Sequence, residues 1–156
     1  CHFETGHNYG YQMTPKDLNG YGHDKGHKTY GYGLLVHPNG KYMDQIKPRW
    51  TQRELEALYV THVQQGSSKV RKWAAKNGLQ LAQNQIDALT CATFNFGPGF
   101  LTLSRYKVCS LIANHAPMQT IWSTWSTLSD HRGLAGLKKR RRWEANWYIG
   151  KKTPLP

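Results

Sequence analysis

The chain of 156 residues has the length of one domain and is long enough to bury a core without disulfide or metal support. Six Trp and nine Tyr exclude a disordered chain, and no apolar run approaches the ~18 residues of a transmembrane helix. The net charge of +12 favours polyanionic partners such as nucleic acid, an anionic membrane or a bacterial wall polymer.

The three cysteines are an odd number and do not have the spacing of metal ligands. Two of them, Cys91 and Cys109, lie in apolar stretches with helical spacing. We expect both to be buried free thiols, with a bridge between them as the alternative. The third cysteine, Cys1, has no assigned role.

A β-hairpin is predicted over residues 29–46, after a Gly-, Tyr- and His-rich segment that we expect to be loop with short extended pieces. Residues 29–36 are rich in strand formers, although Gly31 and Gly33 interrupt them. Asn39-Gly40 is a strong hairpin-turn signal, and residues 41–46 are the expected return strand. Because an isolated hairpin is unstable in water, this one must pack on the rest of the chain.

Helical periodicity fills most of the remaining sequence. Thr51 and Glu54 form a capping box that begins a helix ending near Gly66. Ser67 or Ser68 is expected to cap a second helix that closes at Asn77-Gly78. Further helices are predicted at 83–94, 105–115, 118–128 and 136–149. A segregated hairpin followed by helices indicates the α+β class.

The nine carboxylates were sorted by the elements in which they are expected to lie. Six fall in helices, in the return strand or in a later loop; among them, Glu144 is spaced to pair with Arg140 or Arg141 in one helix. The other three, in the loop-rich segment, are Glu4, Asp17 and Asp24. A glycosidase needs two carboxyl groups beside the scissile bond, one protonated and one ionised.

Five motifs in this order resemble those of the phage-type lysozymes, endolysins of glycoside hydrolase family 24. The resemblance spans residues 2–148. The matching stretches are His2-Phe3-Glu4-Thr5-Gly6, Lys28-Thr29-Tyr30-Gly31-Tyr32-Gly33, Gln85-Ile86-Asp87-Ala88-Leu89, Phe94-Asn95-Phe96-Gly97 and Gly136-Leu137-Lys138-Lys139-Arg140-Arg141-Arg142-Trp143-Glu144.

The chain departs from the family pattern at the second catalytic position. The family has an Asp six residues before the Thr, where this chain has His23, while Asp24 lies five before Thr29. We assign the role to Asp24, with His23 or Asp17 as alternatives. Glu4 and Asp24 are also twenty residues apart, farther than in the family, so an insertion rich in Gly and Tyr separates them.

The resemblance implies a muramidase with a lysozyme-like, mostly helical α+β fold. It would be one catalytic domain over residues 1–156, with a loop and hairpin lobe (1–50) and a helical lobe (51–150) beside an active-site cleft. The reaction implied is hydrolysis of the β-1,4 bond between N-acetylmuramic acid and N-acetylglucosamine in peptidoglycan, leading to bacterial lysis. Glu4, Asp24 and Thr29 are the implied catalytic residues. The resemblance implies that the protein is located in the host cytoplasm before lysis and then acts on the cell wall. We expect it to be a monomer.

No cofactor or metal is implied, because His23 and His27 lack a third ligand at a known spacing. The alternative function is a catalytically inactive peptidoglycan-binding module of the same fold. The basic run Lys138 to Arg142 resembles a nucleic-acid patch. Five consecutive helical residues do not share one face, however, so we expect a solvated surface that attracts anionic envelope polymers and no nucleic acid.

Overall fold

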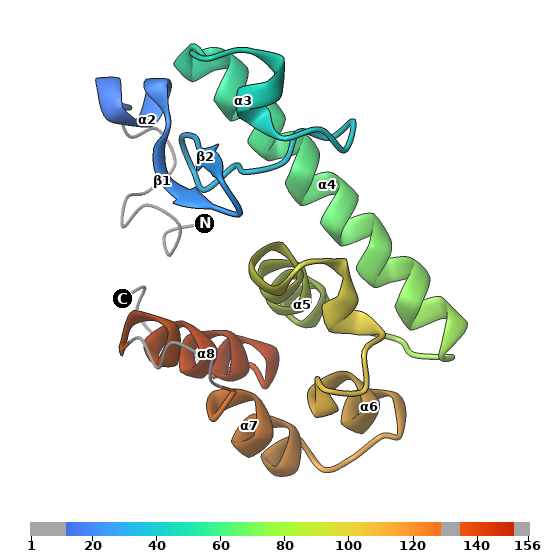
Figure 1. The fold of residues 1–156 in the computed structure, drawn as a ribbon. Helices are drawn as coiled ribbons and strands as arrows, with labels where there is room; N and C mark the ends of the chain where they lie inside the picture. The colour runs from blue at the N-terminus through green and yellow to red at the C-terminus, as the bar shows by residue number, and fades with distance from the viewer. Residues whose placement is uncertain (1–11, 129–134, 152–156) are drawn as a thin grey trace. The chain divides into compact units, whose positions relative to one another are not determined.

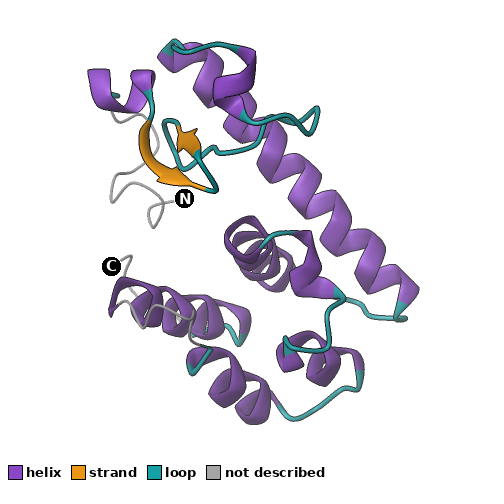
Figure 2. Cartoon of the chain, viewed as in Figure 1, coloured by secondary structure: helices purple, strands orange, loops and turns teal. Residues whose placement is uncertain are grey.

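The computed structural model describes residues 12–128 and 135–151; of His23, Asp24, Pro98 and Ala135 it describes the backbone alone. The chain divides into two compact units, residues 1–64 and 65–156. Helices dominate, and the described residues form a single two-stranded sheet (Figure 2), which confirms the α+β, lysozyme-like fold class. None of the helices in 12–128 or 135–151 is long and apolar enough to cross a membrane.

In the described part of the first unit, the first element is the short helix α2 (Pro15–Asn19), which Asp17 and Thr14 cap with a capping box. The antiparallel strands β1 (Tyr21–Asp24) and β2 (His27–Thr29) follow. Helix α3 (Met43–Ile46) and the first part of α4 (Gln52–Lys76) complete the unit (Figure 1). Its buried apolar residues are Met13, Tyr30, Tyr32, Leu34, Met43, Trp50, Leu55 and Tyr59.

The predicted hairpin over 29–46 is wrong in position, because the strands lie in the preceding segment that we expected to be loop. Gly31 and Gly33 have φ values of 50° and 89°, which end the extended backbone after Thr29. Asn39-Gly40 does reverse the chain, since His37 N donates to Lys41 O at 2.8 Å. Only the isolated bridges Tyr30↔Leu34 and Val36↔Tyr42 form around this turn, and the expected return strand contains helix α3.

Helix α4 begins as its capping box predicts. Glu54 Oε2 accepts from Thr51 N at 2.9 Å, and Thr51 Oγ1 accepts from Glu54 N at 3.3 Å. The predicted break near Gly66 is wrong, since one helix of 25 residues continues through it to Lys76 (Figure 1). Packing explains the continuity: Gly66 lies against Thr90 of α5, and Val70 is fully buried. These contacts outweigh the weak helix propensity of residues 66–68.

The second unit holds α5 (Gln83–Phe96), the 3-10 helix η1 (Pro98–Leu101), α6 (Lys107–Ala113), α7 (Met118–Ser126) and α8 (Ala135–Tyr148). The four predicted helices after residue 80 are confirmed within a few residues, whereas η1 was not predicted. The core includes the fully buried Leu89, Phe100, Val108 and Trp125. Cys91 and Cys109 are buried free thiols, as predicted, and burial raises the pKa of Cys109 to about 12.

Candidate functional site

The β1–β2 hairpin carries two of the three predicted catalytic residues. Lys25 and Gly26 form its turn with φ values of 53° and 81°, the positive pair that a tight two-residue hairpin turn requires. Tyr21 pairs with Thr29 and Asp24 with His27, so β1 contains one more residue than β2 between these pairs. This bulge lies in the stretch that departs from the family spacing. The fold thus brings Asp24 and Thr29 onto neighbouring strands.

A carboxylate from α3 fixes the second strand. Asp44 Oδ1 lies 3.0 Å from His27 Nδ1, and Asp44 Oδ2 accepts from Lys28 N at 3.2 Å. Tyr42 stacks on the His27 ring with centroids 3.6 Å apart. Partial burial opposes ionisation of Asp44, but the hydrogen bonds from Lys28 and His27 outweigh it and lower its pKa. Asp44 therefore holds the backbone immediately before Thr29 as an anionic acceptor.

The two tyrosines of the Thr-Tyr-Gly-Tyr-Gly motif are core residues. Tyr30 is fully buried, its hydroxyl donates to Pro48 O at 3.2 Å, and burial together with the charge of Asp44 raises its pKa. Tyr32 is buried against Tyr59. Thr29 is only half-buried. Thr29 is therefore the hydroxyl-bearing residue of the motif that keeps exposed surface.

The basic motif of α8 forms a buried ion-pair network. Glu144 Oε1 lies 2.9 Å from Arg140 Nε, and its Oε2 lies 2.8 Å from Arg141 Nη1 and 3.1 Å from Trp125 Nε1. Arg140 also donates to Cys91 O, and Arg141 to Asn95 Oδ1. The predicted pairing of Glu144 is confirmed for both arginines, and its role here is to tie α8 to α5 and α7.

The basic run Lys138 to Arg142 does not lie on one face of its helix, as its helical spacing predicted. Lys138, Lys139 and Arg142 are exposed, whereas the two arginines between them are buried. The run thus splits between core and solvent. Helix α5 ends at Phe96, where Gly97 takes a φ of 82°.

The remaining predicted site residues are placed as follows. Glu4 lies outside the described residues. Asp17 Oδ2 accepts from Thr14 N at 2.8 Å, which gives this carboxylate a capping role, and Asp17 O accepts from Gly31 N at 3.0 Å. His23 lies in β1 with Asp24. Among the described residues, no group of three His, Cys, Asp or Glu has an arrangement suited to a metal ion.

Sequence reasoning missed the contact between His27 and Asp44. The two residues are 17 positions apart, and Asp44 was expected in a return strand. No local pattern links them, because the contact depends on how α3 packs against β2. The Asp-Gln pair of α3 carries no motif that could have revealed it.

Comparison with known proteins identifies the family. The family model described as phage lysozyme matches residues 14–144, a range that includes Asp24 and Thr29 and begins after Glu4. No curated protein matches the chain. The match covers well over half of the sequence and agrees with the order of the motifs from β2 to α8. The chain therefore belongs to the phage lysozyme family, whose activity is peptidoglycan hydrolysis.

Proposed function

We propose that the protein is a muramidase that cleaves the β-1,4 bond between N-acetylmuramic acid and N-acetylglucosamine and so lyses bacterial cells. The observation that carries the proposal is the β1–β2 hairpin, which sets Asp24 and Thr29 on paired strands within the family match. The family supports peptidoglycan as the substrate class. The bond, the catalytic residues and the lytic role in a phage-infected host are the proposed part.

In the proposed mechanism, Glu4 protonates the glycosidic oxygen as the bond to the leaving sugar breaks. Asp24 remains ionised and, with the Thr29 hydroxyl, either positions the attacking water or stabilises the oxocarbenium-like charge on the sugar. The clamp of Asp44 on His27 and Lys28 supports this assignment, because it holds the strand that carries Thr29. Because the strand is already fixed, orienting the Thr29 hydroxyl costs no further entropy during the reaction.

The test is the release of reducing ends from purified peptidoglycan by the wild type, Glu4→Gln and Asp24→Asn. Borohydride reduction of the products identifies the bond: muramitol indicates a muramidase, and glucosaminitol indicates cleavage of the other linkage. We expect muramitol from the wild type and loss of activity in both variants, by roughly 100-fold or more. Glu56→Gln is the matched control, since Glu56 lies on α4 and contacts Gln52.

The variants also decide the position of the second group. Full activity in a folded Asp24→Asn variant would contradict its assignment, and His23→Ala and Asp17→Asn would then be compared. An inactive but folded wild type that still sediments with sacculi would instead indicate the non-catalytic wall-binding module. Two observations favour keeping this second candidate: the displaced aspartate in β1, and the start of the family match after Glu4.

A further inference from the structure

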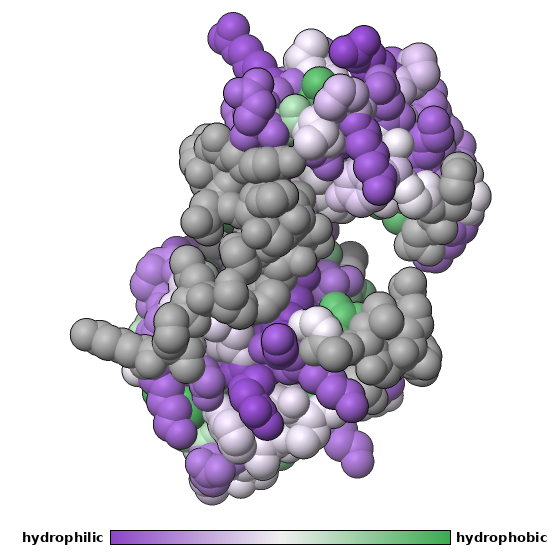
Figure 3. All heavy atoms as spheres, turned by 90° about the vertical axis from the view of Figure 1, so that its left-hand side faces the viewer, coloured by the Kyte–Doolittle hydropathy of each residue, from purple (hydrophilic) through white to green (hydrophobic). Residues whose placement is uncertain are grey.

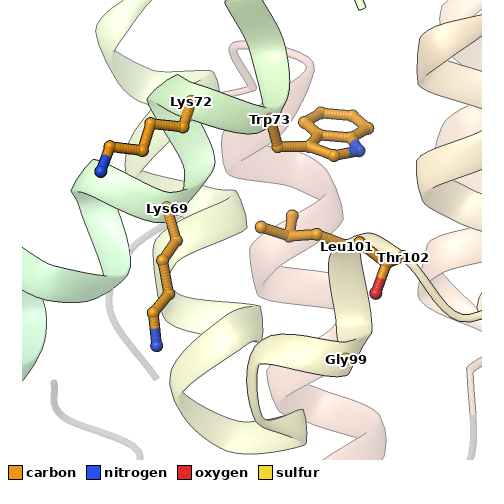
Figure 4. A pocket seen from close by; sticks show the side chains of 6 residues that line it. All are labelled: Lys69, Lys72, Trp73, Gly99, Leu101 and Thr102. Carbon is orange, nitrogen blue, oxygen red and sulfur yellow. The ribbon is translucent and has the colours of Figure 1, made fainter. Parts of the chain in front are cut away.

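We propose that the second unit carries a separate binding site for an anionic, phosphodiester-linked glycopolymer of the bacterial wall. The site is a surface hollow of about 470 Å³ between the C-terminal part of α4 and η1 (Figure 4). It is lined by Lys69, Lys72, Trp73, Gly99, Leu101 and Thr102. The inference extends the proposed function, because it supplies a second attachment to the same wall.

The floor of the hollow is apolar. Leu101 is buried and extends from η1 toward α4 beneath the half-buried indole of Trp73 (Figure 4). Gly99 contributes backbone alone, and a Cβ there would come within 2.7 Å of Leu103. An aromatic ring beside an aliphatic side chain suits the C–H face of a sugar or polyol unit. The volume falls in the range of ordinary small-molecule sites.

The rim is cationic, and the described residues that line the hollow include no carboxylate. Lys69 and Lys72 are exposed, three positions apart on one side of α4 (Figure 4). Among the described residues, no ion pair within 4 Å involves either lysine. Arg71 is directed elsewhere, since its guanidinium donates to Gln83 Oε1 at 3.0 Å. In Figure 4 the two ammonium groups point in different directions, away from Trp73 and Leu101. Because lysine side chains are long and flexible and both lysines line the hollow, they can turn toward a phosphate whose sugar or polyol substituents lie on the apolar floor.

The charge of the surrounding unit favours a polymer over a single anion. Residues 65–128 and 135–151 contain twelve Lys and Arg against two carboxylates, Asp87 and Glu144. Glu144 is fully buried, and Asp87 accepts from Gln83. A polymer with a phosphate in every repeat is attracted to this positive surface through several phosphates at once, whereas a ligand with a single phosphate is attracted through one.

Two other classes of anionic partner fit the hollow less well. Binding of single-stranded nucleic acid relies on successive aromatic platforms, and this hollow offers one half-buried ring. A membrane surface needs a continuous apolar face. The exposed large apolar residues of this unit, among those described, are Leu103 and Met118. On the face drawn in Figure 3, the residues that are not grey are mostly hydrophilic.

The experiment measures the affinity of the whole protein for soluble polyglycerol phosphate substituted with N-acetylglucosamine, at physiological salt. The variant pair is Lys69→Ala/Lys72→Ala, and the matched control is Lys16→Ala/Lys41→Ala, which removes the same charge from two exposed positions of the first unit. We expect the first pair to weaken binding roughly fivefold or more, as two exposed ion contacts allow, and the control to have a clearly smaller effect. Equal weakening in the two pairs would overturn the site, because only net charge would then matter.

A second arm tests the apolar floor. Trp73→Phe keeps an aromatic ring of smaller area, so we expect it to weaken binding of the substituted polymer and to leave binding of plain polyphosphate unchanged. Equal affinity of the wild type for both polymers, with no effect of Trp73→Phe, would overturn the proposal. So would tighter binding of duplex DNA or of anionic lipid vesicles that is lost in Lys69→Ala/Lys72→Ala.

The readout is independent of hydrolysis, because a muramidase has no bond to cleave in this polymer. Failure of the muramidase proposal therefore leaves the binding result unaffected. Conversely, we expect Lys69→Ala/Lys72→Ala to release reducing ends from polymer-free peptidoglycan at the wild-type rate. Each of the two proposals can therefore be refuted without affecting the other.

Discussion

His27 and Asp44 are joined by a 3.0 Å contact between Nδ1 and Oδ1, and the other oxygen of the same carboxylate accepts the backbone N–H of Lys28. One side chain of α3 thereby fixes two consecutive residues of β2, immediately before Thr29. The His27 ring is held on its face by Tyr42. This contact joins α3 to the strand proposed to act on substrate, in addition to the pairing of that strand with β1.

We predict that Asp44→Ala lowers both thermal stability and peptidoglycan hydrolysis, because Lys28 N and His27 lose their acceptor. Asp44→Asn should have a smaller effect, since its amide oxygen still accepts one hydrogen bond. Asp87→Ala is the control, because this half-buried helical carboxylate of the second unit accepts a hydrogen bond from Gln83 and, among the described residues, from no other side chain. Unchanged melting and activity in Asp44→Ala would show that β2 keeps its place without the clamp.

The pH dependence of this clamp has a definite sign. The folded-state pKa of Asp44 lies below the ordinary value of 3.8. Its contribution to stability is therefore complete above that value and is lost as the pH falls through the lowered folded pKa. The stability difference between wild type and Asp44→Asn should be present at neutral pH and shrink in strong acid.

Glu54 provides a second acid-dependent contribution at the start of α4. Lys47 Nζ donates to Oε1 at 2.6 Å, and Thr51 N and Oγ1 donate to Oε2, so the pKa of Glu54 falls to about 2. Because the Glu54 side chain is 42% exposed, solvent screening limits its contribution to the free energy of unfolding to about 1 kcal/mol. We predict that Glu54→Gln destabilises the protein by this amount at pH 7.

Denaturant unfolding of both proteins as a function of pH measures the effect of Glu54. The difference should be constant above the ordinary pKa of 4.5 and vanish as the pH falls to about 2. Glu56→Gln serves as the control, because Glu56 lies on the same helix and takes no part in its N-terminal capping box. A difference that persists at the acid end would assign the effect of Glu54 to packing and not to charge.

The buried network of α8 predicts a large loss of stability. Glu144 is fully buried, and Glu144→Gln leaves the buried guanidiniums of Arg140 and Arg141 without a compensating charge. We expect a cost of about 3–5 kcal/mol in the free energy of unfolding. The exposed Arg142 of the same helix should lose no more than about 0.5 kcal/mol on mutation to Gln. Similar values for the two variants would refute a structural role of Glu144.

Comparing alanine substitutions at two glycines distinguishes the effect of a steric clash from that of backbone strain. Gly20 and Gly40 have φ values of 80° and 90°, so alanine is strained at both. At Gly20 the added Cβ would also lie 2.8 Å from the Tyr30 ring and 2.9 Å from Lys28 Cβ, whereas Gly40 is open. We predict that Gly20→Ala costs about 1–3 kcal/mol more than Gly40→Ala. Thermal melts measure the difference, and equal costs would mean that β2 and Tyr30 shift freely.

Features set by near neighbours in the chain were predictable from the sequence. The capping box of Thr51 and Glu54 and the pairing of Glu144 with Arg140 depend on spacings of three and four residues, and both are present. The apolar periodicity of α5 to α8 likewise identified the helices of the second unit. In each case the decisive interaction lies within one element or along one face.

Features set by tertiary packing were missed. The Gly-Ser-Ser segment at 66–68 indicated a break, but contacts with α5 keep α4 continuous. Because Asn39-Gly40 is a strong turn signal, the hairpin was predicted in the wrong segment. The turn of the hairpin is at Lys25-Gly26, whose sequence signal is weaker. The bond between His27 and Asp44 depends on α3, which was expected to be a strand.

The continuity of α4 has a consequence for how the chain is cut. Compact units are commonly joined by exposed linkers that proteases enter. Here the boundary at residues 64 and 65 falls inside a hydrogen-bonded helix. A protease needs an extended substrate, so cleavage at this boundary requires several turns of helix to unwind first. Proteolysis therefore separates the two units at this boundary only after α4 itself unfolds.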